Sequence, residues 1–286
     1  SGNMPHLADA RLTHSTTRFT LPDTIPQIMT KADEHHLKSA HPEFPLVFMT
    51  VLTQMSLGAF AALLIGDFLS LFGFFEPGWI LALLVLLPAA LGLPLSALHL
   101  GRPLGALGAM KNLRTSWLSR EAAALGIFAG LMGLNVALHF FEMAAPFRII
   151  FEALTLSVGL YGIHAQAMIY RIPARPSWDR VSTNRKFFAA SYSGLFLVAL
   201  ALLVLGHSDS ATPLLSAAMI LGVIHGFFSF EAYHELQSAQ TPQLHKTLRL
   251  YRERFSLLHT MRWVSFAAGA LALPLLTTLF IASDMA

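Results

Sequence analysis

The stretch LVFMTVLTQMSLGAFAALLIG, Leu46–Gly66, decides the fold, because it runs for 21 residues without a charged side chain. About 20 apolar residues of helix span the roughly 30 Å hydrocarbon core of a bilayer. Six further stretches are comparable, and only the fourth of the seven contains an acidic residue, Glu152. The sequence therefore predicts an all-α, polytopic integral membrane helix bundle with seven transmembrane helices, at Leu46–Gly66, Trp79–Leu98, Ala122–Phe141, Ile149–Tyr170, Phe187–Leu205, Ala211–Phe230 and Trp263–Ser283.

The composition agrees with a membrane protein. Of the 286 residues, 55% are hydrophobic and 12% are charged, and this charged fraction is about half of that usual in soluble domains. The chain has no cysteine, so it cannot itself hold a thiolate zinc site or a cysteine-ligated iron–sulfur cluster. Its 19 basic residues are spread over separate loops, whereas nucleic-acid binding needs a basic stripe. The expected surroundings are a lipid bilayer and no nucleic acid.

The basic residues alternate between the loops. Eighteen lie before the first span or in the segments 99–121, 171–186 and 231–262, and Arg148 alone falls on the other side. Because Lys and Arg are enriched in cytoplasmic loops, this bias predicts a multi-pass protein of the cell inner membrane with a cytoplasmic N-terminus. We divide the chain into a polar N-terminal arm, residues 1–40, and a transmembrane domain, residues 41–286.

Candidate chemistry lies at the predicted cytoplasmic ends of the second and third spans. His99 ends "LPLSALHLGRPLGAL", and Glu121 enters the membrane in "RTSWLSREAAALG" at the same level. Oxidation of a quinol removes two electrons and two protons, so its site needs a hydrogen-bond partner and a proton acceptor, which His and Glu supply near neutral pH. Arg102 and Arg120 would stabilise a negatively charged quinone intermediate.

Structural explanations of both residues stay open at this point. His99 is favourable at a helix C-terminus because of the negative end of the helix dipole. Glu121 follows Ser119, a residue type that caps helix N-termini, and an acid in the first helical turn is favoured by the same dipole.

Polar residues inside the predicted spans allow a function other than quinone binding. His164 and His225 lie at similar depths and could ligate a b-type haem, as in a cytochrome subunit, or they and Gln54, Gln166 and Tyr192 could form helix–helix hydrogen bonds or contact a ligand. A small-solute transporter is a third hypothesis. It predicts paired, interrupted helices that meet at the midplane, and the sequence shows no sign of them.

Four strings resemble the membrane-anchor subunit of the dimethyl sulfoxide reductase family: "HPEFPLVFMTVLTQMSLGAF", "LSALHLGRPLGAL", "SWLSREAAALGIFAG" and "MIYRIPARPSWD". The resemblance covers roughly residues 41–283. It implies a subunit that binds menaquinol or ubiquinol and holds an iron–sulfur subunit with [4Fe–4S] clusters and a molybdopterin catalytic subunit at the membrane. The family's important His and Glu correspond to His99 and Glu121. The predicted quinone-binding residues are His99, Arg102, Glu121, Gln54, His164 and Tyr192, and we expect no haem.

The resemblance has two departures. The family normally has eight transmembrane helices, so either a further span follows residue 286, as we expect, or this branch of the family is shorter. The polar arm is also longer than the family's usual start. Some relatives anchor sulfite dehydrogenases, in which electrons run into quinone. We therefore expect a quinone-reactive subunit that is not catalytic by itself, with the substrate of the complex and the direction of electron flow left open.

Overall fold

The computed structural model describes residues 43–73, 75–98, 108, 112–238 and 241–284. The chain divides between Lys38 and Ser39 into two units, and the second, Ser39–Ala286, contains all of the described elements. The predicted polar arm, His99 and Arg102 lie outside the described residues.

Every regular element in the described ranges is helical. Six spans are long and apolar enough to cross a membrane, and a shorter apolar helix covers Trp79–Leu95. This confirms the predicted polytopic membrane bundle, while the number of crossings stays a prediction. The elements are α1 (Phe44–Ser70), α2 (Trp79–Leu98), α4 (Trp117–Phe140), α5 (Ala145–Tyr170), α6 (Val181–Ala189), α7 (Tyr192–Val204), α8 (Ser208–Ser238), α9 (Pro242–Arg249), η3 (Leu250–Arg254), α10 (Ser256–Phe266), η4 (Ala267–Ala272) and α11 (Leu273–Asp284).

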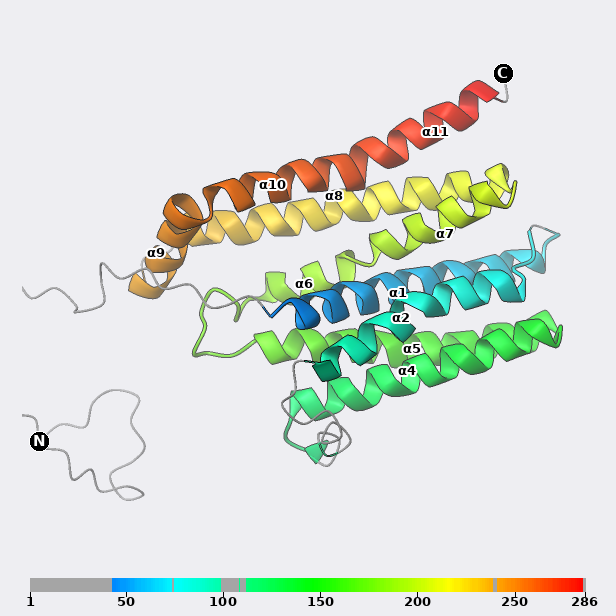
Figure 1. Cartoon of the computed structure of the whole chain (residues 1–286), viewed down its shortest axis with the longest axis horizontal. Coiled ribbons are helices and arrows are strands. Elements are labelled where there is room, and N and C mark those ends of the chain that lie inside the picture. The colour runs from blue at the N-terminus through cyan, green and yellow to red at the C-terminus, as the bar shows by residue number, and fades with distance from the viewer. Residues whose placement is uncertain (1–42, 74, 99–107, 109–111, 239–240, 285–286) are drawn as a thin grey trace, which may run out of the picture. The chain divides into compact units, whose positions relative to one another are not determined.

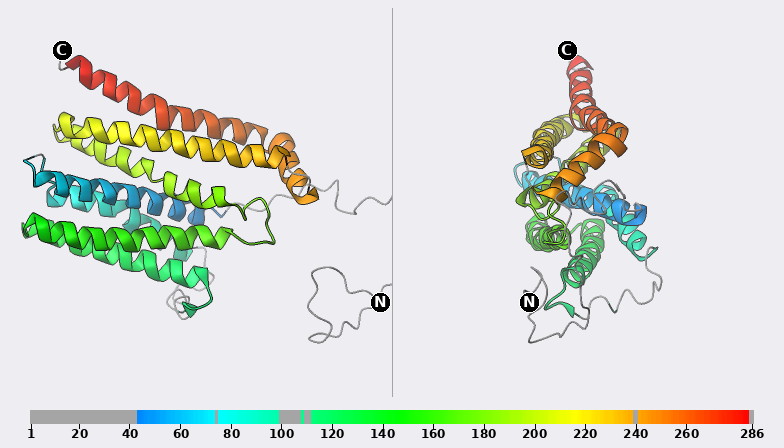
Figure 2. Two further views of the ribbon diagram at one scale, coloured as in Figure 1. Left: turned by 180° about the vertical axis from the view of Figure 1, so that it is seen from behind. Right: turned by 90° about the vertical axis from the view of Figure 1, so that its left-hand side faces the viewer.

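The long helices run side by side, with α1 in the middle of the bundle (Figure 1). Helix α1 packs against α2, α5 and α7, while α4 pairs with α5 and α8 pairs with α7. The last span lies on the outer side of α8 (Figure 2). We call the end where α1 and α4 begin and α5 and α8 finish the basic end, because the connections after α5 and α8 carry most of the described basic residues.

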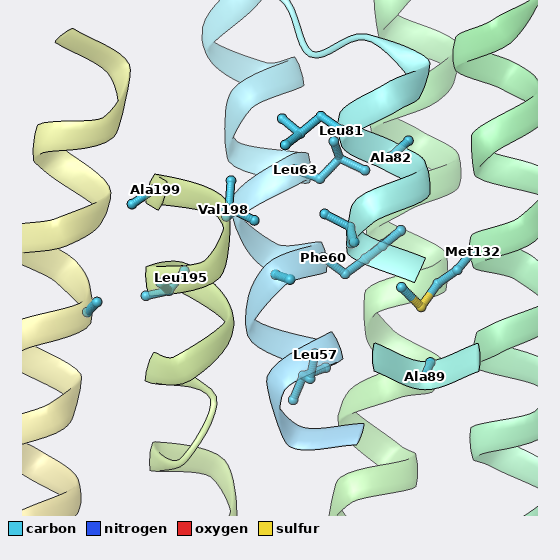
Figure 3. Packing of buried hydrophobic residues seen from close by; sticks show 14 of the residues in the cluster. Leu57, Phe60, Leu63, Leu81, Ala82, Ala89, Met132, Leu195, Val198 and Ala199 are labelled. Carbon is cyan, nitrogen blue, oxygen red and sulfur yellow. The ribbon is translucent and has the colours of Figure 1, made fainter. Parts of the chain in front are cut away.

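The core forms around α1 because its apolar side chains meet helices on several sides. Leu57, Phe60 and Leu63 of α1 are buried against α2, α4 and α7 (Figure 3). Phe60 meets Phe128 of α4 edge to face, with 5.7 Å between ring centroids, a geometry that aromatic rings prefer.

Two glycines let α1 and α7 approach each other closely. A Cβ atom built on Gly58 would overlap the backbone oxygen of Ser191, and one built on Gly194 would overlap the backbone oxygen of Met55. No side chain fits at either place. Small residues at such contacts are typical of membrane helix packing, where van der Waals contact drives association.

Two of the predicted spans contain irregular turns. The fifth has a turn at Ala190 and Ser191, between α6 and α7, and the seventh contains the π-helical η4. Both irregularities adjoin a close helix contact, since Ser191 meets Gly58 of α1, and Ala270 of η4 meets Gly222 of α8. Local packing between neighbouring helices supplies a cause for each that hydropathy cannot reveal.

Candidate functional site

Glu121 is buried in α4, near the basic end of the bundle. The helix begins earlier than the sequence predicted, because Ser116 is its N-cap and accepts a hydrogen bond from the backbone nitrogen of Ser119 at 3.3 Å. Glu121 therefore lies beyond the first helical turn, where the helix dipole no longer explains an acidic residue. Burial of a carboxyl group in a membrane helix requires another reason.

Gln166 of α5 is a close polar neighbour of Glu121. Its Nε2 atom donates to Thr53 Oγ1 of α1 at 3.2 Å and contacts Met49 Sδ at 3.3 Å. Its Oε1 atom is buried and has no partner among the described residues. The group links α1, α4 and α5 and leaves one hydrogen-bond acceptor available to a ligand. We call Glu121, Gln166 and Thr53 the polar triad.

A cavity of about 390 Å³ lies at the basic end. Its wall includes Thr50 of α1 and Tyr170 of α5, which lie on the same helices as Thr53 and Gln166 of the polar triad. The volume falls within the roughly 300–1,000 Å³ of small-molecule sites. Its lining is largely apolar and aromatic and also presents Lys186, Arg262 and His259, so a planar ring with polar substituents fits its chemistry.

The remaining predicted quinone residues fall into two groups. Gln54 is buried on α1 next to Thr53, and His164 of α5 contacts the ring of Trp117 on α4, with centroids 5.7 Å apart. Both share helices with the polar triad. Tyr192 of α7 instead contacts His225 of α8 at 5.7 Å, and no described contact joins it to Glu121.

The two histidines considered as haem ligands have different surroundings. His225 Nδ1 lies 3.2 Å from the backbone oxygen of Lys186, whereas His164 faces α4. Helices α1 and α7 lie between α5 and α8 in both views (Figures 1 and 2). This arrangement counts against a haem bridging the pair.

The basic residues that follow α5 are partly paired. Arg180 binds Glu235 of α8 at 2.7 Å, and Arg185 lies 3.3 Å from Glu231. Arg120, which the sequence placed near the quinone, stacks on Trp117 at 4.3 Å and donates to the Leu113 carbonyl at 2.8 Å. These contacts order the loops of the basic end.

A second polar group, at the opposite end of the bundle, was missed by the sequence reasoning. It comprises Asp67 of α1, Asn135 and His139 of α4, and Arg148 and Glu152 of α5, all buried. We call it the opposite-end cluster. Arg148 was predicted to lie in an external loop, and this is wrong: it belongs to the first turns of α5. The available signal was the i, i+4 spacing of Asn135 with His139 and of Arg148 with Glu152, which puts each pair on one helix face.

Comparison with known proteins gives one family. Residues 37–224, which are 188 of the 286 residues, match the family described as "DMSO reductase anchor subunit (DmsC)". No solved structure matches.

Three individual relatives share between a quarter and a third of their aligned residues with this chain. The protein is 33% identical to one subunit of the sulfite dehydrogenase of Allochromatium vinosum, over 56% of its own length and 54% of the relative, so the match spans about half of that protein. It is 26% identical to one subunit of the anaerobic dimethyl sulfoxide reductase of Haemophilus influenzae, over 69% and 75% of the two lengths. It is 28% identical to the corresponding subunit of Escherichia coli, over 72% of each.

Proposed function

Because the chain belongs to the family of DMSO reductase anchor subunits, we propose that it exchanges electrons between the membrane quinone pool and an iron–sulfur partner subunit. That partner passes electrons to or from a molybdopterin catalytic subunit, which performs the substrate chemistry. The chain itself holds the complex at the membrane. Its resemblance to both dimethyl sulfoxide reductase and sulfite dehydrogenase subunits is compatible with either direction of electron flow.

The observation that carries the quinone site is the polar triad. A quinol offers hydroxyl donors, and the triad offers two kinds of acceptor in an apolar setting, the carboxyl group of Glu121 and the unpartnered Oε1 of Gln166. His99, at the end of the neighbouring span in sequence, supplies the second polar partner, and Arg102 supplies positive charge. Gln54 and His164 flank the triad, and Tyr192 belongs to the same proposed set.

The proton and electron balance fits these residues. When a quinol is oxidised, its two electrons leave to the iron–sulfur partner and its two hydroxyl protons leave to Glu121 and His99, which release them to water at the basic end. Quinone reduction follows the same steps in reverse. The iron–sulfur subunit docks at this end, because electron transfer requires its nearest cluster to lie close to the quinone.

Glu121→Gln is expected to lower quinol-linked kcat by about 10²-fold, since the amide keeps a hydrogen bond but cannot accept a proton. The assay uses the complex purified through a tag on this chain, so the purification also tests whether iron–sulfur and molybdopterin subunits accompany it. Glu253→Gln is the matched control, because Glu253 is exposed in η3 at the same end. Unchanged turnover of Glu121→Gln would contradict the proposed proton acceptor.

A second variant tests whether the quinol ring binds at the polar triad or in the cavity. Arg262→Gln alters its lining and leaves the polar triad intact. If the ring binds at the triad, Glu121→Gln lowers kcat while Arg262→Gln leaves both kcat and KM for quinol near the parent values. A rise in the KM for quinol in Arg262→Gln, but not in Glu121→Gln, would indicate that the quinol ring binds in the cavity.

We also propose that the basic end faces the cytoplasm, since 18 of the 19 Lys and Arg residues belong to segments assigned to this side and this bias orients short loops. A reporter fused after residue 40 or within 231–262 is expected to read as cytoplasmic, and one within 206–210 as external. Cysteine accessibility at the same positions, in a protein that has no native cysteine, provides an independent reading. The reverse pattern would overturn both the orientation and the docking side.

A further inference from the structure

The opposite-end cluster contains three groups that converge on one point. The Nε2 atom of His139 lies 3.1 Å from Glu152 Oε1 and 3.3 Å from Asp67 Oδ2. One ligand-type atom from each of the three residues lies within 4.8 Å of the others. All three side chains are almost wholly withdrawn from solvent, and they come from α1, α4 and α5.

The hydrogen bond of His139 Nδ1 determines whether Nε2, the nitrogen that faces the carboxylates, carries a proton. The Nδ1 atom lies 2.9 Å from the backbone oxygen of Pro77, and a carbonyl can only accept, so Nδ1 carries the proton. In the neutral imidazole the other nitrogen is then a bare acceptor. Three acceptor atoms therefore meet at the centre of the cluster, and a proton or a metal ion has to lie between them.

The cluster also has more acceptors than donors. Arg148 donates to both oxygens of Asp67, at 3.0 and 2.8 Å, and Asn135 Nδ2 donates to Glu152 Oε1 at 3.0 Å. Glu152 Oε2 and Asn135 Oδ1 are buried and have no hydrogen-bond partner among the described residues. A proton on His139 would bridge the central atoms and leave these two oxygens unsatisfied.

A small divalent cation with a bound water would satisfy both the three central acceptor atoms and the two unpartnered oxygens. Zinc takes imidazole nitrogen and carboxylate oxygen at about 2.0–2.2 Å in tetrahedral geometry, and the edges of such a tetrahedron are about 3.3 Å long. The two observed separations from Nε2, 3.1 and 3.3 Å, are close to that edge. A metal-bound water would occupy the fourth position and could donate its two hydrogens to Glu152 Oε2 and Asn135 Oδ1.

The surroundings match those of a metal site in other respects. Ligating histidines usually donate their second ring N–H to a carbonyl or carboxylate, and ligating carboxylates are themselves hydrogen bonded; Pro77, Asn135 and Arg148 provide these contacts. Charge also balances. Two positive charges on the metal and one on Arg148 equal the three negative charges of Asp67, Glu152 and Glu76, the last of which binds Arg148 at 2.8 Å.

We propose that Asp67, His139 and Glu152 bind a zinc-class divalent cation, which ties α1, α4 and α5 together at the end of the bundle remote from the quinone site. Three protein ligands from three helices make the ion a structural cross-link. This site is independent of the proposed quinone chemistry, because none of its residues belongs to the polar triad or lines the cavity.

The test counts metal in the complex purified through this chain and dialysed against dilute zinc. Elemental mass spectrometry is expected to find about one zinc ion per chain, lost in Glu152→Gln and retained in Glu76→Gln, the matched control outside the ligand set. Asn135→Leu is expected to weaken zinc binding by about 10–100-fold, as loss of a contact to a ligating group does.

Two further measurements keep the test decisive if Glu152→Gln assembles poorly. Cobalt(II) exchanged into the parent complex is expected to give the intense visible absorption of a tetrahedral site, and a chelator is expected to lower the melting temperature of the parent protein. Equal zinc content in the parent and in Glu152→Gln, or a parent that binds none and melts identically with chelator, would overturn the proposal and leave a proton, not a metal, between the central atoms.

Discussion

His99→Ala is expected to abolish quinol-linked turnover while the complex stays assembled. The residue follows the last residue of α2, and the proposal gives it one of the two polar contacts to the quinone ring. Loss of a positioned acid–base group lowers a rate by about 10²–10⁴-fold, so the quinol assay should fall to near background. Alanine cannot substitute through a retained hydrogen bond, and this effect should exceed that of Glu121→Gln.

The assay for His99→Ala has two internal controls. An artificial dye that exchanges electrons directly with the partner subunits should give parental activity, because their chemistry does not pass through His99. His245→Ala makes the same change at an exposed position of α9, also at the basic end, and should leave both activities unchanged. Normal quinol kinetics in His99→Ala would remove this residue from the site, and joint loss of the quinol and dye activities would indicate failed assembly.

Arg148→Met is expected to destabilise the bundle by about 3–5 kcal/mol, the usual cost of leaving one partner of a buried ion pair alone. Arg148 holds Asp67 through two hydrogen bonds, at 3.0 and 2.8 Å, and Asp67 is fully buried. Without the guanidinium, and with metal removed by a chelator, the Asp67 carboxylate would remain inside the protein without a pairing cation. Thermal unfolding in detergent, read as the loss of monodisperse protein, measures the effect.

A double substitution separates charge from packing. With metal removed by a chelator, Arg148→Met combined with Asp67→Asn removes both charges and is expected to recover part of the lost stability, since the stranded charge is the main cost. Arg185→Met is the surface control: its pairing with Glu231 at 3.3 Å is partly exposed, and such pairs contribute about 0–1 kcal/mol. A similar small effect for Arg148→Met would show that the buried pair does not hold the helices together.

The membrane architecture was predictable because hydropathy is a local property of sequence. Each predicted span overlaps a described helix, and the alternation of basic residues follows directly from residue counts. One error is local in origin, and one irregularity is not. Asp67 was placed outside the first span because the apolar run ends at Gly66, yet α1 continues to Ser70. The break at Ser191 depends on Gly58, 133 residues earlier in the sequence.

The candidate sites were predictable only in part. Glu121 was recognisable as an acid entering a membrane helix next to a matching motif, but its link to Gln166 and Thr53 needs three helices to be placed together. The opposite-end cluster joins residues separated by up to 85 positions, from Asp67 to Glu152. Spacing along one helix indicates which residues share a face, and it gives no information on which face of another helix they meet.

The central place of α1 has a consequence for how the protein is made. Helix α1, in the middle of the bundle, leaves the ribosome before α2, α4 and α5, and its polar groups must wait for partners that are synthesised later. Thr53 bonds Gln166, and Asp67 bonds Arg148, so both partners emerge after two further spans have been inserted. During that interval an insertion factor, or water at the ends of α1, must provide hydrogen-bond partners for these groups. Biogenesis, and not only the finished structure, therefore limits how polar α1 can be.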